Sequence, residues 1–451
     1  MKLNKYLLMA AMGLGLVACT ENDLVEGGDS NGAQNEGTTY VGFSLKFNAS
    51  NTRATTTGEE NGTAAEQKIN TAYVVMANAS GVIEAVASTT EAGTALNDKK
   101  DCYVFQTTPG VHYFYAVVNP DVSGNVTTSL VAGNNIDDYF NTGTALTVSE
   151  IASATDADNG SFMMASHEVL TANVEDGVTK DEALAGSANS YTINVERASA
   201  KVTMTCENTT LTNATNNADG TITTPKFTLK GGATMSYRMA QNPFAEITGN
   251  AWSYESSATN VYVKQPSDDN NIHRSADPVY CLENIHTTGY KQGNTTYLTL
   301  QTTFTPANVV DCADEVKPLT TNTQAAGSTF YVVKQGELAG NYLMAKDLQD
   351  YRDSKSDQSA LPAGVEAISD AYTDGNCYFG PIWIGQEEAD DANAPVVRNT
   401  WYNLKITGIT LPGDPEEPTI DPEQPLTPAT NVAITLSVMP WNFIGRDIEL
   451  Q

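Results

Sequence analysis

The sequence contains few charged residues, and very few of them are basic. Charged residues make up 17% of the 451 residues, with 24 lysines and arginines against 54 aspartates and glutamates. The formal net charge of −30 repels the phosphates of nucleic acids and of anionic lipids, so we expect neither as a partner. Acidity of this kind is typical of a solvated protein surface.

Catalytic and metal-binding motifs are also missing. The histidines His112, His167, His273 and His286 lie in no HExxH or HxH pattern, and no GxSxG, GxxxxGK[ST] or GxGxxG segment occurs. The segment DADNG at 156–160 resembles the start of a calcium loop, but His167 stands where an EF-hand requires an acid. We therefore expect no catalytic residue, no metal and no cofactor, and a secreted hydrolase is the least favoured function.

Cysteines are few and lie far apart. Besides Cys19 there are five, without a CxxC pair: Cys102, Cys206, Cys281, Cys312 and Cys377. We expect mainly free, buried thiols, with one or two disulfides as the alternative in an oxidising compartment.

The only long apolar run is at the start of the chain. Lys2 and Lys5 precede an apolar segment at 6–17, which is short for a membrane span. It ends in Leu-Val-Ala-Cys, a sequence typical of bacterial lipoprotein cleavage sites. We predict that residues 1–19 are a signal peptide and that Cys19 is lipidated, which anchors the precursor to the outer membrane without spanning it.

The remaining composition favours β-structure. Few charges, many threonines and valines, and 20 tyrosines suit strands better than helices. Short strand-like runs are separated by turn signals such as Pro109-Gly110, without regular alternation of strands and helices. We predict an all-β sandwich fold with few short helices. The best helix candidate is 340–354, whereas 129–143 suits either a helix or a loop.

The first predicted strand follows a polar, acidic and glycine-rich linker at 20–37. Four apolar residues alternate with polar or small ones, which predicts a half-buried strand: Val41, Phe43, Leu45 and Phe47. Residues 48–66 then return to loop composition, with Arg53 as their only basic residue. Loops of small, polar residues are preferred sites of proteolysis.

The last predicted strand follows a spacer at 412–430, whose proline and acidic residues favour an extended chain of roughly 50 Å. Residues 431–451 contain an alternating apolar set, Val432, Ile434, Leu436 and Val438, before Pro440 interrupts the pattern and Trp441 continues it in the opposite phase. In one interpretation the spacer wraps around its domain and the strand joins its own sheet. In the other, the strand pairs with a second molecule.

Three segments carry a family resemblance. INVERASAKV at 193–202, PVVRNTWY at 395–402, and LSVMPW at 436–441 with DIEL at 447–450 resemble the fimbrillins of Bacteroidales, whose pili are called type V. The resemblance implies two transthyretin-like β-sandwich domains, at 38–196 and 197–411.

The resemblance also implies a mode of assembly. An arginine-specific protease would cut the Arg53–Ala54 bond and remove residues 38–53 together with the lipid. The C-terminal strand of a neighbouring subunit would then fill the vacated groove, making a homopolymer that joins anchor and tip subunits in a cell-surface fimbria. As a shaft subunit, the chain would mediate adhesion to host or bacterial surface ligands and contribute to virulence.

Physical arguments support this interpretation. Burial of each of the four apolar side chains of the first strand would stabilise the fold by about 1.5–3 kcal/mol. Loss of this strand would therefore leave an apolar groove and an unpaired strand edge. A head-to-tail contact between copies generates open filaments. The alternative is a monomeric surface lipoprotein that binds glycans or host ligands through exposed aromatics such as Trp252, Tyr254 and Trp383.

Overall fold

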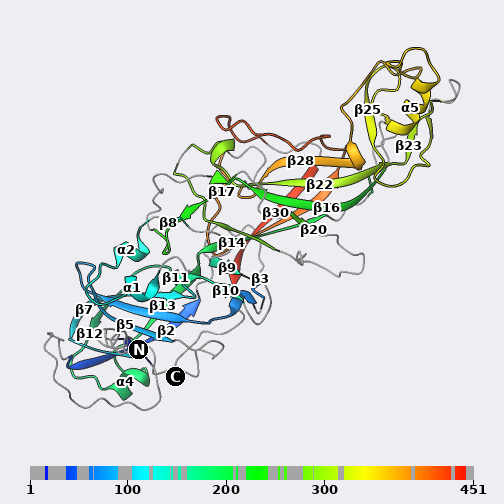
Figure 1. Ribbon diagram of the computed structural model, residues 1–451. Helices are drawn as coiled ribbons and strands as arrows, with labels where there is room; N and C mark the ends of the chain where they lie inside the picture. Colours follow the sequence, from blue (N-terminus) through cyan, green and yellow to red (C-terminus); the bar gives the residue numbers. More distant parts are fainter. Residues whose placement is uncertain are drawn as a thin grey trace, which may run out of the picture.

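The structure, a computed structural model, is built mainly from β-strands joined by turns and short helices (Figure 1), which confirms the all-β prediction. It describes residues 16–18, 37–47, 60–63, 65–89, 104–120, 125–142, 144–145, 151–153, 160–206, 210–211, 220–241, 252–253, 259–261, 278–287, 289–312, 319–386, 392–427 and 432–442. Within these residues, no helix is long and apolar enough to cross a membrane.

The N-terminal domain contains a nine-stranded sheet. In sheet order its strands are β1 (Leu16–Ala18), β5 (Ile83–Thr89), β4 (Ala72–Ala77), β7 (Gly110–Val118), β11 (Met164–Ser166), β13 (Ser190–Arg197), β2 (Thr39–Phe47) and β6 (Val104–Thr107), with β12 (Leu170–Val174) paired to β7. Gly110 has a φ of 129°, which suits the predicted turn between β6 and β7.

One hydrophobic core fills the N-terminal domain. Val74 on β4, Phe114 on β7 and Val195 on β13 are all fully buried in it. The same core includes Trp401, which comes from the other end of the chain. The two domains are therefore packed together rather than merely tethered.

The C-terminal domain is a sandwich of two five-stranded sheets. The first contains β21 (Val279–Leu282), β14 (Ser199–Cys206), β29 (Thr400–Ile409), β30 (Val432–Asn442) and β3 (Glu60–Asn61). The second contains β15 (Thr210–Leu211), β16 (Gly220–Lys230), β22 (Tyr297–Pro306) and β28 (Asn376–Trp383), with β20 (Thr259–Val261) paired to β16. Buried residues of both, such as Leu404 and Leu300, share one core.

Small elements complete the fold. The two-stranded pairs are β10 (Ser161–Phe162) with β9 (Ala152–Ser153), β17 (Gly232–Ala233) with β19 (Trp252–Ser253), β18 (Met235–Ser236) with β8 (Thr144–Ala145), and β23 (Asn308–Val310) with β24 (Leu319–Thr321). The helices are η1 (Ala65–Gln67), α1 (Val126–Ser129), α2 (Asp137–Phe140), α4 (Lys180–Leu184), η5 (Gln292–Asn294), α5 (Ala345–Asp353) and η6 (Thr373–Gly375). The helix predicted at 340–354 is thus confirmed as α5, and 129–143 holds only the short α2.

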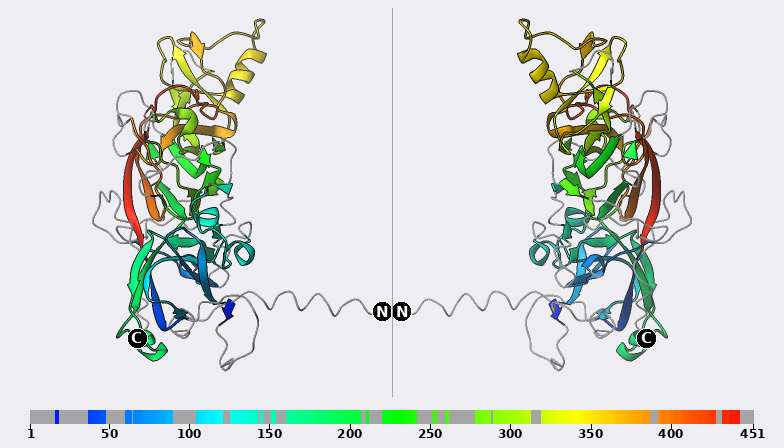
Figure 2. Two further views of the ribbon diagram at one scale, coloured as in Figure 1. Left: turned by 90° about the vertical axis from the view of Figure 1, so that its left-hand side faces the viewer. Right: turned by 90° about the vertical axis from the view of Figure 1, so that its right-hand side faces the viewer.

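An insertion between β22 and β28 forms the far end of the molecule. It contains α5, the pair β23 and β24, and a sheet of β26 (Tyr342–Met344), β25 (Phe330–Gln335) and β27 (Ala367–Ile368). It has a small core of its own, which includes Val310, Leu343 and Leu348. Figure 2 shows this insertion in yellow at the end opposite the N-terminal domain, so the described parts form an elongated molecule.

β13 ends at Arg197 and β14 begins at Ser199, so the chain passes from the first main sheet to the second at Ala198. The division into domains at 38–196 and 197–411 stays a prediction. Two strand pairs cross this boundary, because β8 pairs with β18 and β3 pairs with β30. Segments distant in sequence therefore bind the domains to each other.

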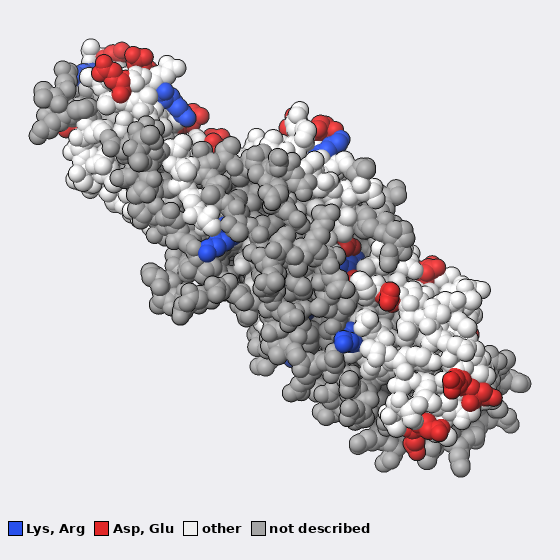
Figure 3. Space-filling view, turned by 180° about the vertical axis from the view of Figure 1, so that it is seen from behind, with Lys and Arg blue, Asp and Glu red and all other residues white. Residues whose placement is uncertain are grey.

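The surface of the described residues carries more acidic than basic side chains, as the composition indicates. In Figure 3 the red acidic groups lie mostly toward the two ends of the molecule. Of the cysteines whose side chains the structure describes, Cys281 and Cys377 are buried, Cys312 is half-buried, and all three are free. The expectation of free thiols is confirmed for these three.

Candidate functional site

The first strand occupies an interior position in the N-terminal sheet. β2 runs parallel to β13, with Phe43 opposite Tyr191, and antiparallel to β6, with Val41 opposite Phe105. Val41, Phe43 and Leu45 are at most 2% exposed, whereas the side chain of Phe47 lies outside the described residues. The predicted half-buried strand is confirmed, and its removal by proteolysis stays a prediction.

Phe43 occupies an aromatic pocket within this position. Its ring centroid lies 4.5 Å from that of Phe114, 5.7 Å from that of Phe105 and 6.3 Å from that of Tyr191. Tilted and edge-on contacts of this kind add to the energy of simple burial. Phe43 is therefore a main anchor of β2.

A strap formed by residues 175–189 lies over the first half of β2. Tyr40 N donates to Val178 O at 2.9 Å, and Gly42 N donates to Asn189 O at 2.9 Å. Asn189, which is 7% exposed, also donates to Tyr40 O at 3.0 Å. A Cβ atom on Gly42 would stand 2.7 Å from Ala183 O, so α4 leaves room for glycine only. The sequence reasoning missed this strap, because its contacts are to backbone atoms.

Two strand edges depend on β2. Among the described residues, β6 is hydrogen-bonded to no strand but β2, and β13 has β2 on one side and β11 on the other. Removal of β2 would therefore leave two unpaired edges that face a common gap, one parallel and one antiparallel to the lost strand. Such edges are templates for another strand.

The last strand lies in the sheet of its own domain. β30 is antiparallel to β29, and the four alternating apolar residues stand opposite buried residues of β29: Val432 opposite Ile409, Ile434 opposite Ile406, Leu436 opposite Leu404, and Val438 opposite Tyr402. Figure 2 shows β30 in red beside the orange β29. This arrangement is the first of the two interpretations above, so the donor role stays a prediction that requires β30 to leave this sheet.

The spacer before β30 is bound to the C-terminal domain. Lys230 Nζ pairs with Glu417 Oε1 at 2.6 Å, and Tyr378 N donates to Asp414 O at 2.9 Å. Trp383 Nε1 donates to Thr427 O at 2.7 Å. The spacer thus lies against its own domain, as in the first of the two interpretations above, because basic and backbone groups of the domain bind its acidic residues and carbonyls.

The prediction that Trp383 is an exposed, glycan-binding aromatic is wrong. It is 3% exposed and packs edge-on against Tyr297 with a centroid distance of 5.2 Å. The side chains of Trp252 and Tyr254 lie outside the described residues, as do Cys19, Arg53 and Ala54. No group of three or more histidine, cysteine, aspartate or glutamate residues in the described part of the chain could hold a metal.

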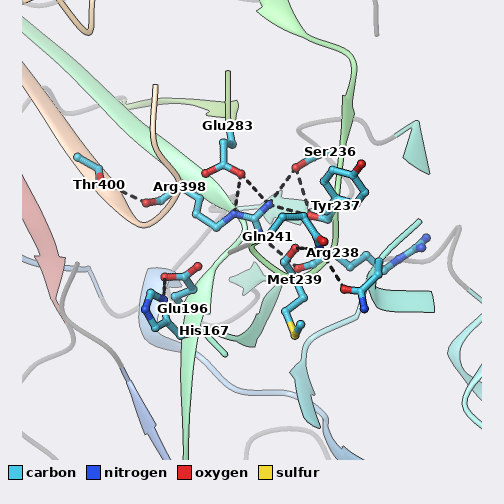
Figure 4. Close-up of polar contacts among 11 residues, drawn as sticks. His167, Glu196, Ser236, Tyr237, Arg238, Met239, Gln241, Glu283, Arg398 and Thr400 are labelled. Atoms are coloured by element: carbon cyan, nitrogen blue, oxygen red, sulfur yellow. Dashed lines mark hydrogen bonds and ion pairs between the residues drawn. The ribbon is translucent and has the colours of Figure 1, made fainter. Parts of the chain in front are cut away.

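The arginine of the PVVRN segment is a buried hub at the domain junction (Figure 4). Arg398, 2% exposed, lies 3.1 Å from Glu283 Oε2 and donates to Tyr237 O at 2.8 Å and Arg238 O at 3.2 Å. Arg238 in turn donates to Tyr139 O at 3.2 Å, on α2 of the N-terminal domain. Arg398 therefore fixes a loop that contacts the other domain.

The VER segment meets the PVVRN segment directly. Arg197 Nη1 donates to Asn399 Oδ1 at 3.3 Å, and both residues are at most 2% exposed. Asn399 has a φ of 53° and its backbone N donates to Ser199 O at 2.8 Å. Burial lowers the pKa of Arg197 to about 10. Two motifs about 200 residues apart in the chain thus join at the point where it changes domain.

A second buried charge cluster lies beside Arg197. Glu66 on η1 is fully buried, and its Oε1 lies 2.8 Å from Lys201 Nζ on β14 and 2.7 Å from Tyr280 OH on β21. Thr63 N donates to Glu66 Oε2 at 2.7 Å, and Arg197 Nε donates to Glu66 O at 3.2 Å. We name Thr63, Glu66, Arg197, Lys201 and Tyr280 the junction cluster.

The junction cluster keeps Glu66 ionised. Burial alone would raise the pKa of Glu66, but the ion pair with Lys201 and the hydrogen bonds from Lys201, Tyr280 and Thr63 outweigh it and lower the pKa below its ordinary value. Burial and the neighbouring Glu66 raise the pKa of Tyr280, which keeps its hydroxyl group protonated as a donor. Nothing in the spacing of the sequence indicated that Glu66 pairs with Lys201, 135 residues away.

Comparison with known proteins points to one family. Residues 370–447 match the family model described as "Major fimbrial subunit protein type IV, Fimbrillin, C-terminal". The resemblance to fimbrillins is confirmed. The matched range contains β28, β29, the spacer and β30. The match supports a structural role as a subunit of a cell-surface fimbria, rather than an enzymatic one.

Two solved fimbrial proteins of Porphyromonas gingivalis are similar to the chain. A fimbrilin has 16% identity and a TM-score of 0.48, with 91% of this chain and 99% of that chain covered. A tip fimbrial protein with a C-terminal truncation has 14% identity and a TM-score of 0.39, with 85% and 98% covered. A search of the curated proteins finds no match. The motifs at 193–202, 395–402 and 436–450 also suggest a specific likeness to the major subunit of the short fimbria of Porphyromonas, which stays a prediction.

We expect Glu66→Gln to destabilise the protein by about 3–5 kcal/mol, because it leaves the Lys201 charge buried without its counter-ion. Replacing both partners, as in Glu66→Gln with Lys201→Met, should recover most of this loss. Urea unfolding followed by fluorescence measures both variants. Equal destabilisation in the single and double variants would contradict a coupled pair.

The His167–Glu196 pair predicts a pH-dependent contribution to stability. His167 Nδ1 lies 2.8 Å from Glu196 Oε2, and this hydrogen bond raises the pKa of His167 above its ordinary value. The stabilisation is fully present below the unfolded pKa near 6.5 and is lost as the pH rises through the folded value. Because His167 is 45% exposed, we expect at most about 1 kcal/mol.

The measurement compares urea unfolding of the native protein with that of His167→Gln at pH 5.5 and pH 8.5. The difference in unfolding free energy between the two proteins should be larger at the lower pH. A larger difference at pH 8.5 would contradict the assigned direction.

Proposed function

We propose that this chain is the shaft subunit of a cell-surface fimbria and that it polymerises by strand exchange. The precursor is exported as a lipoprotein through Cys19, and hydrolysis of the Arg53–Ala54 bond by an arginine-specific protease releases β2. The C-terminal strand of a neighbouring subunit then fills the gap between β13 and β6. The observation that carries this proposal is the position of β2, which lies between β13 and β6 in the nine-stranded sheet and is the only described strand paired with β6.

The energetics of the gap favour a replacement strand. Val41, Phe43 and Leu45 are buried, and the burial of each side chain stabilises the fold by about 1.5–3 kcal/mol. Removal of β2 loses this stabilisation and exposes the apolar surface that these side chains cover. The backbone groups of β13 and β6 also lose their partners. A strand with four alternating apolar residues restores both contributions, and 432–438 has this pattern.

When β30 acts as a donor strand, it exchanges the contacts in its own sheet for contacts in a neighbour's sheet, so the contacts that it gains replace others that it loses. In the monomer β30 pairs with β29 from Val432 to Pro440, and leaving that sheet forfeits those contacts. The same strand would form comparable contacts in its neighbour, so the intact precursor has no net drive to polymerise. Removal of β2 opens a site with no other occupant, and this difference favours the filament. Because donor and acceptor lie on different surfaces, the contact repeats without closing into a ring.

The family match and the pattern of strands support this assembly with anchor and tip subunits as further partners. Binding of host or bacterial surface ligands follows from the adhesive role of fimbriae. The insertion around α5 lies far from β2 and at the opposite end of the molecule (Figure 1), so it is available for such contacts in a filament. Membrane attachment belongs to the lipidated precursor alone.

We expect Arg53→Ala to yield a precursor that stays lipid-anchored and monomeric, because β2 is not released. Native protein recovered from the cell surface should begin at Ala54, as determined by N-terminal sequencing. Brief trypsin treatment should produce ladders on unboiled gels from the native precursor and none from the variant. Cleavage at Arg53 without oligomers would contradict the proposal.

Disulfide trapping tests which strand fills the gap. Thr192 on β13 is exposed and stands opposite Ser44 of β2, so a cysteine there borders the vacated position. A second cysteine is placed in turn at Ala433, Thr435 or Ser437. After trypsin treatment, at least one pair should form an intermolecular disulfide that appears as covalent ladders on non-reducing gels.

Thr221 on β16 is the matched control, since it is an exposed strand residue of the C-terminal domain. Thr221→Cys, combined with the same three changes, should give no ladder. Ladders of equal strength from Thr192→Cys and Thr221→Cys, or ladders from neither, would refute insertion of the C-terminal strand beside β13.

A further inference from the structure

The last two described residues of β30 are paired with a short strand from the N-terminal part of the chain. β3 runs parallel to β30, with Glu60 opposite Trp441 and Asn61 opposite Asn442. Among the described residues, β29 lies along one edge of β30, and β3 is the element on its other edge. The contact is confined to the last two described positions of β30.

β3 is held in place by the junction cluster. Only four residues lie between Asn61 and Glu66, whose carboxylate is fixed by Lys201 and Tyr280. Gln67 Nε2 also donates to Gly62 O, which closes the turn between β3 and η1. The position of β3 is therefore set by a buried ion pair and not by the two backbone contacts alone.

The opposite end of β30 is also held. The spacer that leads into it is bound through Trp383 Nε1 to Thr427 O, and Gln292 Nε2 donates to Pro425 O at 3.0 Å. A strand with a bound spacer at one end must separate from its sheet starting at the other end. That other end of β30 is the one that β3 covers.

We propose that residues 60–67 form a clasp that retains the end of β30 in the C-terminal sheet of the uncleaved precursor. The inference rests on the proposed function, in which β30 must leave that sheet to act as a donor. The clasp adds an inhibitory contact of its own, since β30 cannot peel away until β3 separates from it.

The clasp also lies next to the proposed maturation site in sequence. β2 ends at Phe47 and β3 begins at Glu60, so both strands flank the segment that contains Arg53. In the precursor, β3 is attached on one side to β2 and on the other to Glu66. Cleavage after Arg53 removes the first attachment, so that β3 is then held by the junction cluster and by its two pairings with β30. The same cut thus opens the acceptor gap and loosens the donor.

Hydrogen–deuterium exchange measured by mass spectrometry tests the clasp in the full-length precursor. All samples carry Arg53→Ala, so that neither cleavage nor polymerisation occurs. Peptides covering 432–442 should exchange about tenfold faster in Glu66→Gln than in the reference protein, because β3 loses its anchor. Tyr280→Phe removes one hydrogen bond to Glu66 and should give a smaller increase, which provides a second variant if Glu66→Gln folds poorly.

Glu283→Gln is the matched control. It breaks the buried pair with Arg398 at the same junction, without touching β3 or η1. Exchange at 432–442 is compared with that of β22 peptides at 297–306, which report any destabilisation of the whole protein, and in Glu283→Gln this ratio should equal that of the reference protein. Unchanged exchange at 432–442 in both Glu66→Gln and Tyr280→Phe would overturn the clasp, as would an equal increase in Glu283→Gln.

The exchange result is independent of strand donation, because the samples remain monomeric. With Arg53 restored, trypsin should start ladder formation sooner in Tyr280→Phe than in the native precursor. Faster exchange without ladders in any protein would support the clasp and count against the proposed polymerisation. Ladders together with unaltered exchange at 432–442 would support the proposed polymerisation and count against the clasp.

Discussion

The buried ion pair between Glu66 and Lys201 is the contact on which the arrangement of the two domains depends. Two charges removed from water are stable only when each satisfies the other, and here Tyr280 and Thr63 complete the hydrogen bonds of the carboxylate. Because Glu66 and Lys201 come from segments 135 residues apart, the pair forms only when both domains are folded. It also sets the position of β3, and through it the end of β30.

Strand pairing can be exchanged without a change in chemistry, and this property links the two ends of the chain. A strand in its own sheet and the same strand in a neighbour's sheet make similar backbone contacts, so the preference between them depends on which edges are free. In the proposed assembly, the covalent connection to β2 keeps one edge occupied in the precursor. Proteolysis would suit this control because it is irreversible and would remove the competing strand.

Particular residues show how far the sequence could predict this site. The alternation at 41–47 indicated β2 with its buried face, and Arg197 and Arg398 were singled out within motifs, though not as buried partners of junction residues. The strap over β2 was missed because Asn189 and Val178 bind backbone atoms, which every residue possesses. The sequence left open whether the spacer wraps around its own domain, because the contacts of its acidic residues and carbonyls with Lys230 and with the backbone of the domain depend on the tertiary structure.

By itself, the sequence determined the strands, since side-chain alternation with a period of two is a local property of the chain. It also determined the family resemblance and the excess of aspartate and glutamate over lysine and arginine. Only the tertiary structure decided which edges those strands share, that β30 lies beside β29, and that Glu66 meets Lys201. Those contacts join residues far apart in the chain, and their energy depends on burial, which no local pattern specifies.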